Sequence, residues 1–311
     1  MKPQLAEDAN LDAVRFPCIV QPKIDGVRAL NLTGKLTGRS MKPFGGFGVT
    51  EYFSRGEFKG LDGEMTLGGK PNCIERLCSL TTGAMGRFNG VQEMPDLHWW
   101  VFDNLEVPQR EYRARYEALR VRVVDLGHPR IHLVPMTEVN GPIELEYFIA
   151  KYADEGYEGT ILRNPEAPYK EGRATRKGQE LWRIKSWADA EILVTGITEG
   201  QSNGNAATTN LLGRTERSSA KAGMVPNGEV GSIQGTMIKD FFDPIFGKLL
   251  FAQGLPVTIS SGAMSVPEAK YYFRNPDKII NHIVKFKHMT HGVKDLPRFG
   301  SYLSHRLPED M

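Results

Sequence analysis

One six-residue stretch, residues 23–28 (KIDGVR), constrains this chain most, because it fixes a lysine between two predicted strands. The apolar run at residues 16–20, which Pro22 closes, predicts the first strand, and the alternation at residues 29–32 predicts the second. Gly26 permits a sharp turn between them or the close approach of a ligand to the backbone. The stretch therefore holds a lysine, a carboxylate and an arginine at the end of one strand.

Lys23 in this setting suits a nucleophile that attacks a nucleotide phosphate. A lysine must lose its proton before it attacks, and nearby cations and a metal ion disfavour the ammonium form. Arg28 supplies a cation, and Asp25 would hold the metal directly or through water. The alternative is a β-turn with a solvated lysine, and the motif alone does not decide between the two.

The length and composition of the chain indicate a soluble globular protein. A chain of 311 residues predicts two domains, with one large α/β domain as the alternative. The apolar fraction of 40% and the charged fraction of 24% are ordinary for such proteins. The net charge is only +2, so a surface for nucleic acid must come from local clustering of the 39 lysines and arginines.

The cysteines and the start of the chain predict a cytoplasmic protein. Cys18, Cys73 and Cys78 are odd in number and lack paired CxxC spacing, which argues against a disulfide framework or a zinc site and fits a reducing compartment. The first ten residues do not resemble a signal peptide, and no apolar run approaches the length that spans a membrane. We therefore expect no membrane partner.

Strands and helices mix over the first part of the chain, which predicts an α+β domain at residues 1–187 with antiparallel sheets and flanking helices. We expect helices at residues 1–15, 50–58, 110–125 and 143–155, and an irregular segment at residues 70–95. We expect strands on both sides of the lysine motif, a hairpin at residues 30–38, and strands at residues 61–65, 97–105, 131–134, 158–163 and 181–185.

The composition changes near residues 187–189, where we place the domain boundary. Short β runs at residues 190–197, 231–238, 256–260 and 281–286, with one or two short helices, predict a small OB-fold barrel at residues 188–311. Residues 200–228 are polar and rich in small side chains, which predicts a long exposed loop. Arg214, Arg217 and Lys221 in this loop, and Lys285 and Lys287 on a barrel strand, would lie along DNA phosphates.

Charged clusters on the predicted strands supply what nucleotidyl transfer needs. Carboxylates hold magnesium, and cations neutralise the phosphate charge in the transition state. Each residue has a plainer alternative. For Arg39, Arg298 and Arg306 the alternative is a surface charge, and for Phe102 it is a core residue. For Asp62 and Glu64 the alternative is that they face solvent on an edge strand. For Glu158 and Arg163 it is pairing with other charges.

The order of these clusters resembles the covalent nucleotidyltransferase superfamily, and most closely the small ATP-dependent DNA ligases of bacteriophages. The residues that carry the resemblance are Lys23, Asp25, Gly26, Arg28, Arg39, Ser40, Asp62, Gly63, Glu64, Phe102, Asp103, Glu158, Gly159, Arg183 and Lys185. The end of the chain, with Arg298, Arg306, Glu309 and Asp310, is similar to the last motif of these ligases. The chain departs from the family's usual residues at Gln21, Arg183, Gly300, Tyr302 and the final Met311.

The resemblance implies a role for each position. Lys23 would carry AMP, with Asp25, Arg28 and Lys185 completing the catalytic set, and Asp25 and Glu158 would serve the metal. The nucleotide-binding residues would be Gln21 at the adenine edge, Arg28, Glu64 at the ribose, Phe102 stacked on the base, Arg183, Lys185, Arg298 and Arg306. Arg39, with Ser40 beside it, would bind the 5′-phosphate of a nick.

The resemblance predicts a monomeric ligase for DNA replication, repair and recombination, active in the cytoplasm of a bacterial host if the chain is viral. It would use ATP and Mg²⁺ or Mn²⁺ to seal 3′-OH/5′-phosphate nicks through a lysyl-AMP and a DNA-adenylate. An RNA ligase and an mRNA capping guanylyltransferase remain alternatives within the superfamily. A non-enzymatic nucleic-acid-binding protein with an OB module is the alternative from another class.

Overall fold

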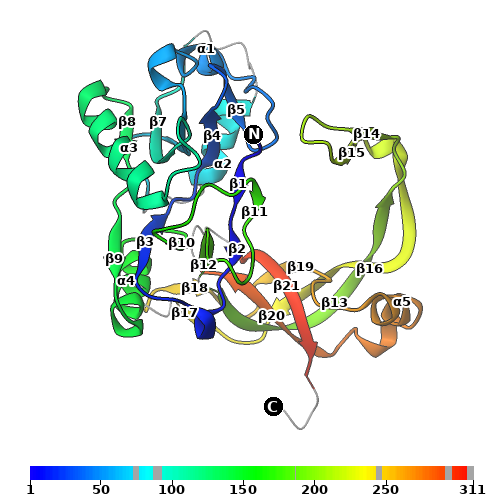
Figure 1. Cartoon of the computed structure of the whole chain (residues 1–311). Helices are drawn as coiled ribbons and strands as arrows, with labels where there is room; N and C mark the ends of the chain where they lie inside the picture. Colours follow the sequence, from blue (N-terminus) through cyan, green and yellow to red (C-terminus); the bar gives the residue numbers. More distant parts are fainter. Residues whose placement is uncertain (73–76, 87–92, 186, 243–246, 291–295, 307–311) are drawn as a thin grey trace. The chain divides into compact units, whose positions relative to one another are not determined.

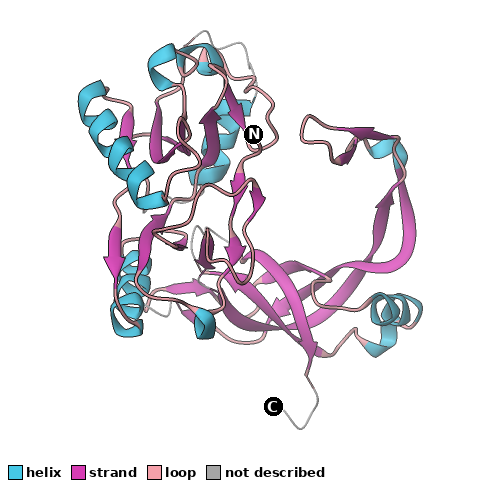
Figure 2. Cartoon of the chain, viewed as in Figure 1, coloured by secondary structure: helices cyan, strands magenta, loops and turns pink. Residues whose placement is uncertain are grey.

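A computed structural model describes residues 1–72, 77–86, 93–185, 187–242, 247–290 and 296–306 (Figures 1 and 2). The chain forms two compact units, Met1–Lys185 and Ser186–Met311. The sequence placed the boundary two residues later, but Trp187 begins β13 (Trp187–Asn203), the first strand of the second unit. In the part of the chain that the structure describes, no helix is long and apolar enough to cross a membrane.

The first sheet of the first unit has the order β2-β12-β10-β3-β9. Its strands are Glu7–Asp8, Trp182–Lys185, Gly159–Arg163, Cys18–Lys23 and Thr137–Val139. Successive side chains of a strand point to opposite faces, so Cys18, Val20 and Leu162 pack with Leu145 and Tyr152 of α4 (Pro142–Asp154). The other face of β3 carries the lysine of the motif at its end, as predicted.

The second sheet has the order β5-β4-β6-β7-β8. Its strands are Leu36–Gly38, Val27–Asn31, Leu61–Leu67, Leu97–Asn104 and Ile131–Leu133, and the predicted hairpin is β4 and β5. One face forms a core with Ala29, Met65 and Trp99, to which α1 (Val49–Tyr52), α2 (Leu77–Gly86) and α3 (Tyr112–Leu126) contribute. The opposite face carries Arg28 and Glu64, which take no part in this core, so it is available to form a site.

Two predictions for the first unit were wrong. Residues 1–15 contain β1 (Gln4–Leu5), β2 and the 3₁₀ helix η1 (Leu11–Ala13) in place of a longer helix, because the start of the chain pairs with β11 (Gly172–Arg173) and β12. Residues 70–95, expected to be irregular, contain α2, whose Leu77, Thr81 and Met85 are buried. Both errors arise because distant contacts outweigh weak local preferences. A further 3₁₀ helix, η2 (Gly56–Phe58), follows α1.

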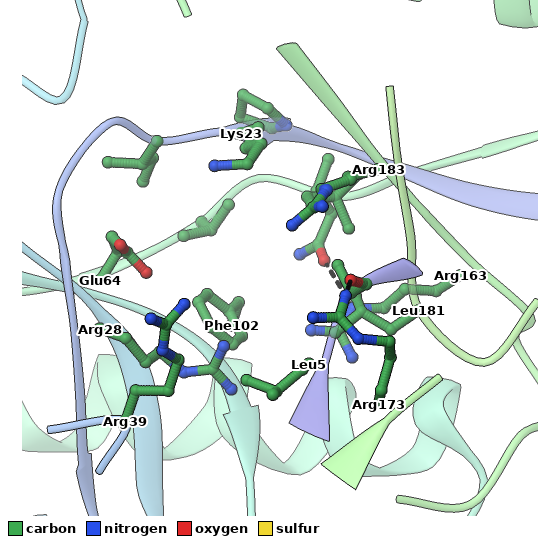
Figure 3. A pocket seen from close by; sticks show the side chains of 16 residues that line it. Leu5, Lys23, Arg28, Arg39, Glu64, Phe102, Arg163, Arg173, Leu181 and Arg183 are labelled. Carbon is green, nitrogen blue, oxygen red and sulfur yellow. Dashed lines mark hydrogen bonds between the residues drawn. The ribbon is translucent and has the colours of Figure 1, made fainter. Parts of the chain in front are cut away.

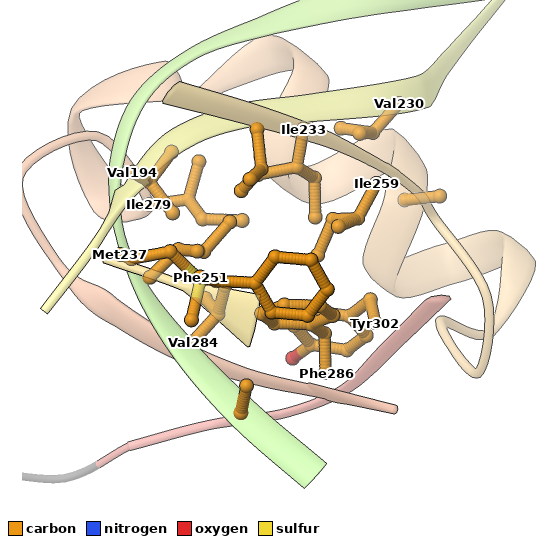
Figure 4. Packing of buried hydrophobic residues seen from close by; sticks show 14 residues of the cluster. Val194, Val230, Ile233, Met237, Phe251, Ile259, Ile279, Val284, Phe286 and Tyr302 are labelled. Atoms are coloured by element: carbon orange, nitrogen blue, oxygen red, sulfur yellow. The ribbon is translucent and has the colours of Figure 1, made fainter. Parts of the chain in front are cut away.

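The second unit contains a closed barrel of five strands in the order β13-β16-β19-β21-β20, the architecture predicted for it. Beyond β13, these are Met224–Met237, Pro256–Ser260, Arg298–His305 and Ile283–Met289. Val194, Ile233, Ile259, Phe286 and Tyr302 fill the interior (Figure 4). Outside the barrel and residues 200–228, the described part of this unit also contains α5 (Val266–Arg274), η4 (Pro276–Lys278) and the paired β17 (Phe241–Phe242) and β18 (Leu249–Phe251).

Residues 200–228 are mostly exposed, as the sequence predicted, but they form strands in place of a long loop. β13 and β16 continue beyond the barrel as a pair whose register runs to Asn203 opposite Met224. The hairpin of β14 (Ala207–Thr209) and β15 (Thr215–Arg217), followed by η3 (Lys221–Gly223), extends it (Figure 1). We call residues 201–226 the arm. Its polar composition hid the strands, because neither face of the arm is buried in the core and no apolar alternation is required.

Candidate active site

Three adjacent strands bring the two candidate lysines together. Lys23 at the end of β3 lies opposite Gly159 on β10, and Gly159 lies opposite Lys185 on β12. A Cβ atom on Gly159 would lie 2.1 Å from the carbonyl oxygen of Ile184, so only glycine permits this approach of the strands. The row Lys23, Gly159, Lys185 is therefore fixed by backbone pairing.

Glu158 joins the two lysines. Its amide donates to the carbonyl of Lys23 at 2.9 Å, its carboxylate pairs with the Lys23 amine, and Lys185 Nζ lies 2.8 Å from Oε1. Burial alone would raise the pKa of Glu158, but the two lysines outweigh burial and lower it to about 2. A carboxylate with this pKa remains ionised at neutral pH, so Glu158 orients the lysines and is a poor acceptor for their protons.

The second sheet contributes a buried arginine and an aromatic ring. Arg28 on β4 binds Asp62 in a bidentate pair, with Nε–Oδ1 at 2.6 Å and Nη2–Oδ2 at 2.7 Å. Its guanidinium lies 4.6 Å from the centre of the Phe102 ring. Burial opposes the charge of Arg28, but Asp62 more than offsets burial and raises the pKa of the guanidinium. Asp62 is fully buried on a central strand, so the solvent-facing alternative was wrong.

Glu64 lies on the same face of the second sheet, opposite Arg28 across the β4–β6 ladder. Burial raises its pKa to about 7, although the charges of Lys23 and Arg28 act in the opposite direction and Glu158 adds to the rise. Glu64 therefore lies close enough to Lys23 and Glu158 for both charges to change its pKa. Buried carboxylates with strongly raised pKa values are characteristic of functional sites.

Of these residues, Lys23, Arg28, Glu64 and Phe102 line one pocket of the first unit (Figure 3). Its cationic residues are Lys23, Arg28, Arg39, Arg163, Arg173 and Arg183, and its apolar residues include Leu5, Ile24, Phe102, Val134, Ile161 and Leu181. An apolar part with an aromatic ring suits a nucleobase, and a cationic part suits phosphates. The residues present therefore fit a nucleoside triphosphate.

Sequence reasoning missed the role of Arg163 and did not consider Arg173. Arg163, only 2% exposed, stands 4.2 Å over the Tyr112 ring and binds Asp103 at 3.3 Å. Its position on β10, two residues from the pocket residue Ile161, was the available signal, because alternate residues of a strand share a face. Arg173 donates to the carbonyl of Ala6 at 2.9 Å, a contact that no local pattern predicts.

The structure places the remaining predicted residues of the first unit in several environments. Arg39 is exposed and lines the pocket, and Ser40 beside it is exposed on the same turn. Arg183 lines the pocket while its Nε donates to Asp8 at 2.7 Å. Asp25 is 4% exposed and is not among the lining residues, and its metal role stays a prediction.

The other predicted residues belong to the second unit. Arg306 Nε donates to Glu191 at 2.7 Å, Lys285 lies 2.6 Å from Asp189, and the Lys287 amine lies over the Trp187 ring at 5.2 Å. The guanidinium of Arg298 lies 5.1 Å from the Phe299 ring, and Arg214, Arg217 and Lys221 are exposed on the arm. Their nucleotide and DNA roles stay predictions, and Glu309 and Asp310 lie outside the described residues.

A divalent metal fits the carboxylates of this site. Glu64 and Glu158 supply hard oxygen donors beside Lys23, and Mg²⁺ usually binds one or two carboxylates together with substrate phosphates and water. Within the described ranges, no group of three histidine, cysteine, aspartate or glutamate side chains forms a metal cluster. Such a site would therefore depend on the phosphates of the bound nucleotide.

Comparison with known proteins agrees with this geometry. Residues 3–185 match the model of the ATP dependent DNA ligase domain. DNA ligases of African swine fever virus are 29% identical over 146 residues, which cover 45% of this chain and 32% of the viral protein. The match thus spans about a third of the length of these viral relatives.

Solved structures of ligases share the fold of the whole chain. The Chlorella virus DNA ligase-adenylate is 23% identical with a TM-score of 0.51, and the match covers 98% of this chain and 99% of that one. A structure from a study of Lig E DNA ligases is 20% identical with a TM-score of 0.70 over the same shares. These likenesses confirm the predicted fold class, an adenylation-type domain followed by an OB-fold barrel. Because the family model matches more than half of the chain, this protein belongs to the ATP-dependent DNA ligase domain family.

Proposed function

We propose that this protein is a DNA ligase that seals 3′-OH/5′-phosphate nicks in duplex DNA with ATP. The observation that carries the proposal is the row Lys23, Gly159, Lys185 with Glu158 between the lysines, at the edge of a cationic and aromatic pocket. An amine in this position faces the pocket that suits a triphosphate. Membership of the ligase family supports DNA as the acceptor.

The reaction would proceed through three displacements at phosphorus. The Lys23 amine, once deprotonated, attacks the α-phosphorus, forming an N–P bond while the bond to pyrophosphate breaks. The 5′-phosphate of the nick then takes the AMP from Lys23, and the 3′-hydroxyl attacks the resulting DNA-adenylate and expels AMP. Each displacement depends on positioning and charge neutralisation, which this chain supplies through Lys185, Arg28 and the other pocket arginines.

A divalent ion, Mg²⁺ or Mn²⁺, would neutralise the phosphates when bound. In place of the predicted pair Asp25 and Glu158, we propose Glu64 and Glu158 as its protein donors, because Glu64 lines the pocket and Asp25 does not. Arg39 and the exposed cations of the arm would bind the DNA backbone. We further propose that the protein acts as a monomer in the cytoplasm of its host. The cysteine count supports this compartment.

Intact mass spectrometry tests the proposal directly. The protein is incubated with Mg²⁺ and ATP or GTP, alongside Lys23→Ala and the matched control Lys35→Ala, whose lysine is exposed on the β4–β5 hairpin. We expect an AMP adduct in the wild type and in Lys35→Ala, none in Lys23→Ala, and discharge of the adduct by a nicked duplex. A GMP adduct, an adduct that survives in Lys23→Ala, or an AMP adduct that nicked DNA does not discharge would each refute it.

A further inference from the structure

A row of four residues crosses the first sheet along the wall of the pocket and ends at the sheet edge. Gln21 of β3 lies opposite Ile161 of β10. Ile161 in turn lies opposite Arg183 of β12, and Arg183 lies opposite Asp8 of β2. The first three of these residues line the pocket, whereas Asp8 is not among the lining residues. Asp8 is therefore the neighbour of a pocket arginine without being part of the pocket wall.

The backbone fixes the place of Asp8 on the edge strand β2. The amide of Glu7 donates to the carbonyl of Leu181 at 3.1 Å, and the amide of Ala9 donates to the carbonyl of Arg183 at 2.9 Å. These two bonds flank Asp8 and hold it in register with Arg183. Opposite charges that face each other across two strands attract, so the strand pairing brings the Asp8 carboxylate to the Arg183 guanidinium.

The contact uses one of the three nitrogens of the Arg183 guanidinium. Arg183 Nε donates to Asp8 Oδ1 at 2.7 Å, and this hydrogen bond lowers the pKa of Asp8, so the carboxylate is ionised at neutral pH. Across the described ranges of the chain, neither Nη1 nor Nη2 of Arg183 has a hydrogen-bond partner. Figure 3 shows the guanidinium pointing into the pocket, on the side where the Lys23 amine lies. The two terminal amino groups are thus left as a fork that matches two oxygens of one phosphate group.

We propose that Asp8 is a positioning residue, which holds Arg183 through Nε so that both terminal amino groups face a phosphate group of the bound nucleotide. Asp8 itself would touch neither the nucleotide nor Lys23. The inference rests on the proposed nucleotidyl transfer and adds to it a residue outside the pocket that presents one of the pocket cations. It also accounts for the arginine at position 183, because arginine can bind a carboxylate with one nitrogen and a phosphate with the two others.

A lysine in place of Arg183 could not serve both partners in this way. Its ammonium is a single nitrogen on a flexible stem, so Asp8 and the phosphate would compete for it. Asp8 would thus assist an arginine and hinder a lysine. This difference in sign separates a positioning role of Asp8 from a general contribution to folding.

The exposure of the pair sets the size of the effect. The side chain of Asp8 is 75% exposed and that of Arg183 is 29% exposed. Because solvent screens the charges, an ion pair of this kind changes an equilibrium or rate constant by at most about fivefold. The same screening weakens the opposing effect, which is repulsion between Asp8 and the phosphates. We therefore expect a net loss of about two- to fivefold when the carboxylate is removed.

The test measures the second-order rate constant for formation of the AMP adduct on Lys23 with ATP and Mg²⁺. Asp8→Ala should lower this rate constant by about two- to fivefold. Asp8→Asn should lie closer to the wild type than Asp8→Ala does, because the amide oxygen still accepts from Arg183 Nε. Asp12→Ala, which removes an exposed carboxylate of η1, is the matched control and should react like the wild type.

The second arm repeats Asp8→Ala in an Arg183→Lys background. Arg183→Lys alone should react more slowly than the wild type, and the addition of Asp8→Ala should make it at least about twofold faster, because the lysine no longer pairs with a carboxylate. If Asp8 only stabilised the fold, Asp8→Ala would slow both backgrounds alike. The backbone bonds of β2 do not use the Asp8 side chain, so these variants should fold. Thermal unfolding checks this, and Asp8→Asn remains as the variant with the smaller change.

The failures of the two proposals are distinct. If the wild type forms no adduct with ATP, the proposed function fails. If the adduct forms but Asp8→Ala reacts as fast as the wild type or faster, or if Asp8→Asn is as slow as Asp8→Ala, the positioning role of Asp8 is refuted while the ligase chemistry stands. A further slowing of Arg183→Lys by Asp8→Ala would refute that role as well.

Discussion

Replacing Glu64 by glutamine should stabilise the first unit at pH 8 by up to about 3 kcal/mol. Burial raises the pKa of Glu64 from 4.5 to about 7 in the folded protein. A difference of one in pKa corresponds to about 1.4 kcal/mol between the two protonation states. Ionising Glu64 inside the pocket therefore costs the fold free energy, although Lys23 and Arg28 offset part of the burial. Glutamine keeps the shape of the side chain without the charge.

The sign and the pH range follow from the direction of this change. Because the folded state holds the proton of Glu64 more tightly than the unfolded state, the contribution of Glu64 to stability is fully present below pH 4.5. It is lost as the pH rises through about 7. The wild type and Glu64→Gln should thus have similar free energies of unfolding at pH 4.5, and the variant should gain its advantage between that pH and pH 8.

Urea unfolding followed by tryptophan fluorescence measures this difference. Three of the four tryptophans, Trp99, Trp100 and Trp182, lie in the first unit, so the signal reports mainly on that unit. Glu146→Gln, on the exposed surface of α4, is the matched control and should show no such change between the two pH values. The reasoning is wrong if Glu64→Gln differs from the wild type by the same amount at both pH values, or if it is the less stable protein at pH 8.

Two further predictions concern the strand pairing and the arm. Gly159→Ala should destabilise the first unit by more than about 3 kcal/mol, because the added Cβ would lie 2.1 Å from Ile184 O and strain at a special backbone position has effects on this scale. Gly83→Ala is the control, since a Cβ added at Gly83 would have no neighbour within 4 Å. Equal urea midpoints for the two variants would contradict this prediction. The double variant Arg214→Ala/Lys221→Ala should still form the Lys23 adduct. It should reduce the slope of log K for DNA against log salt by about 1.8 if both cations contact phosphates, and an unchanged slope would remove the arm from the DNA interface.

The sequence predicted the elements whose signals are local. The strand that ends in Lys23, the hairpin after it, and the helix α3 with its glycine stop at Gly127 follow from alternation, turn residues and helical spacing. The ordered charged motifs also predicted the ligase family. These signals lie within a few residues of each other, so they do not depend on how the chain packs.

The sequence did not predict elements whose partners are distant. Residues 4–8 form strands only because residues 172–173 and 182–183 lie beside them. The strands of the arm pair with each other and need no apolar face, so the polar composition gave no periodic signal. In both cases the hydrogen bonds that define the element join residues that the local pattern does not connect.

For the candidate site, the sequence by itself determined which side chains are available: a lysine in a strand-ending motif, carboxylates on two later strands and several arginines. Only the tertiary structure decided their chemical state. Glu158 is ionised because two lysines flank it, Glu64 holds its proton more tightly because it is buried, and the guanidinium of Arg183 is oriented because Asp8 lies opposite it. Protonation and side-chain orientation depend on burial and on neighbouring charges, and both arise only when strands far apart in the sequence are brought into one sheet.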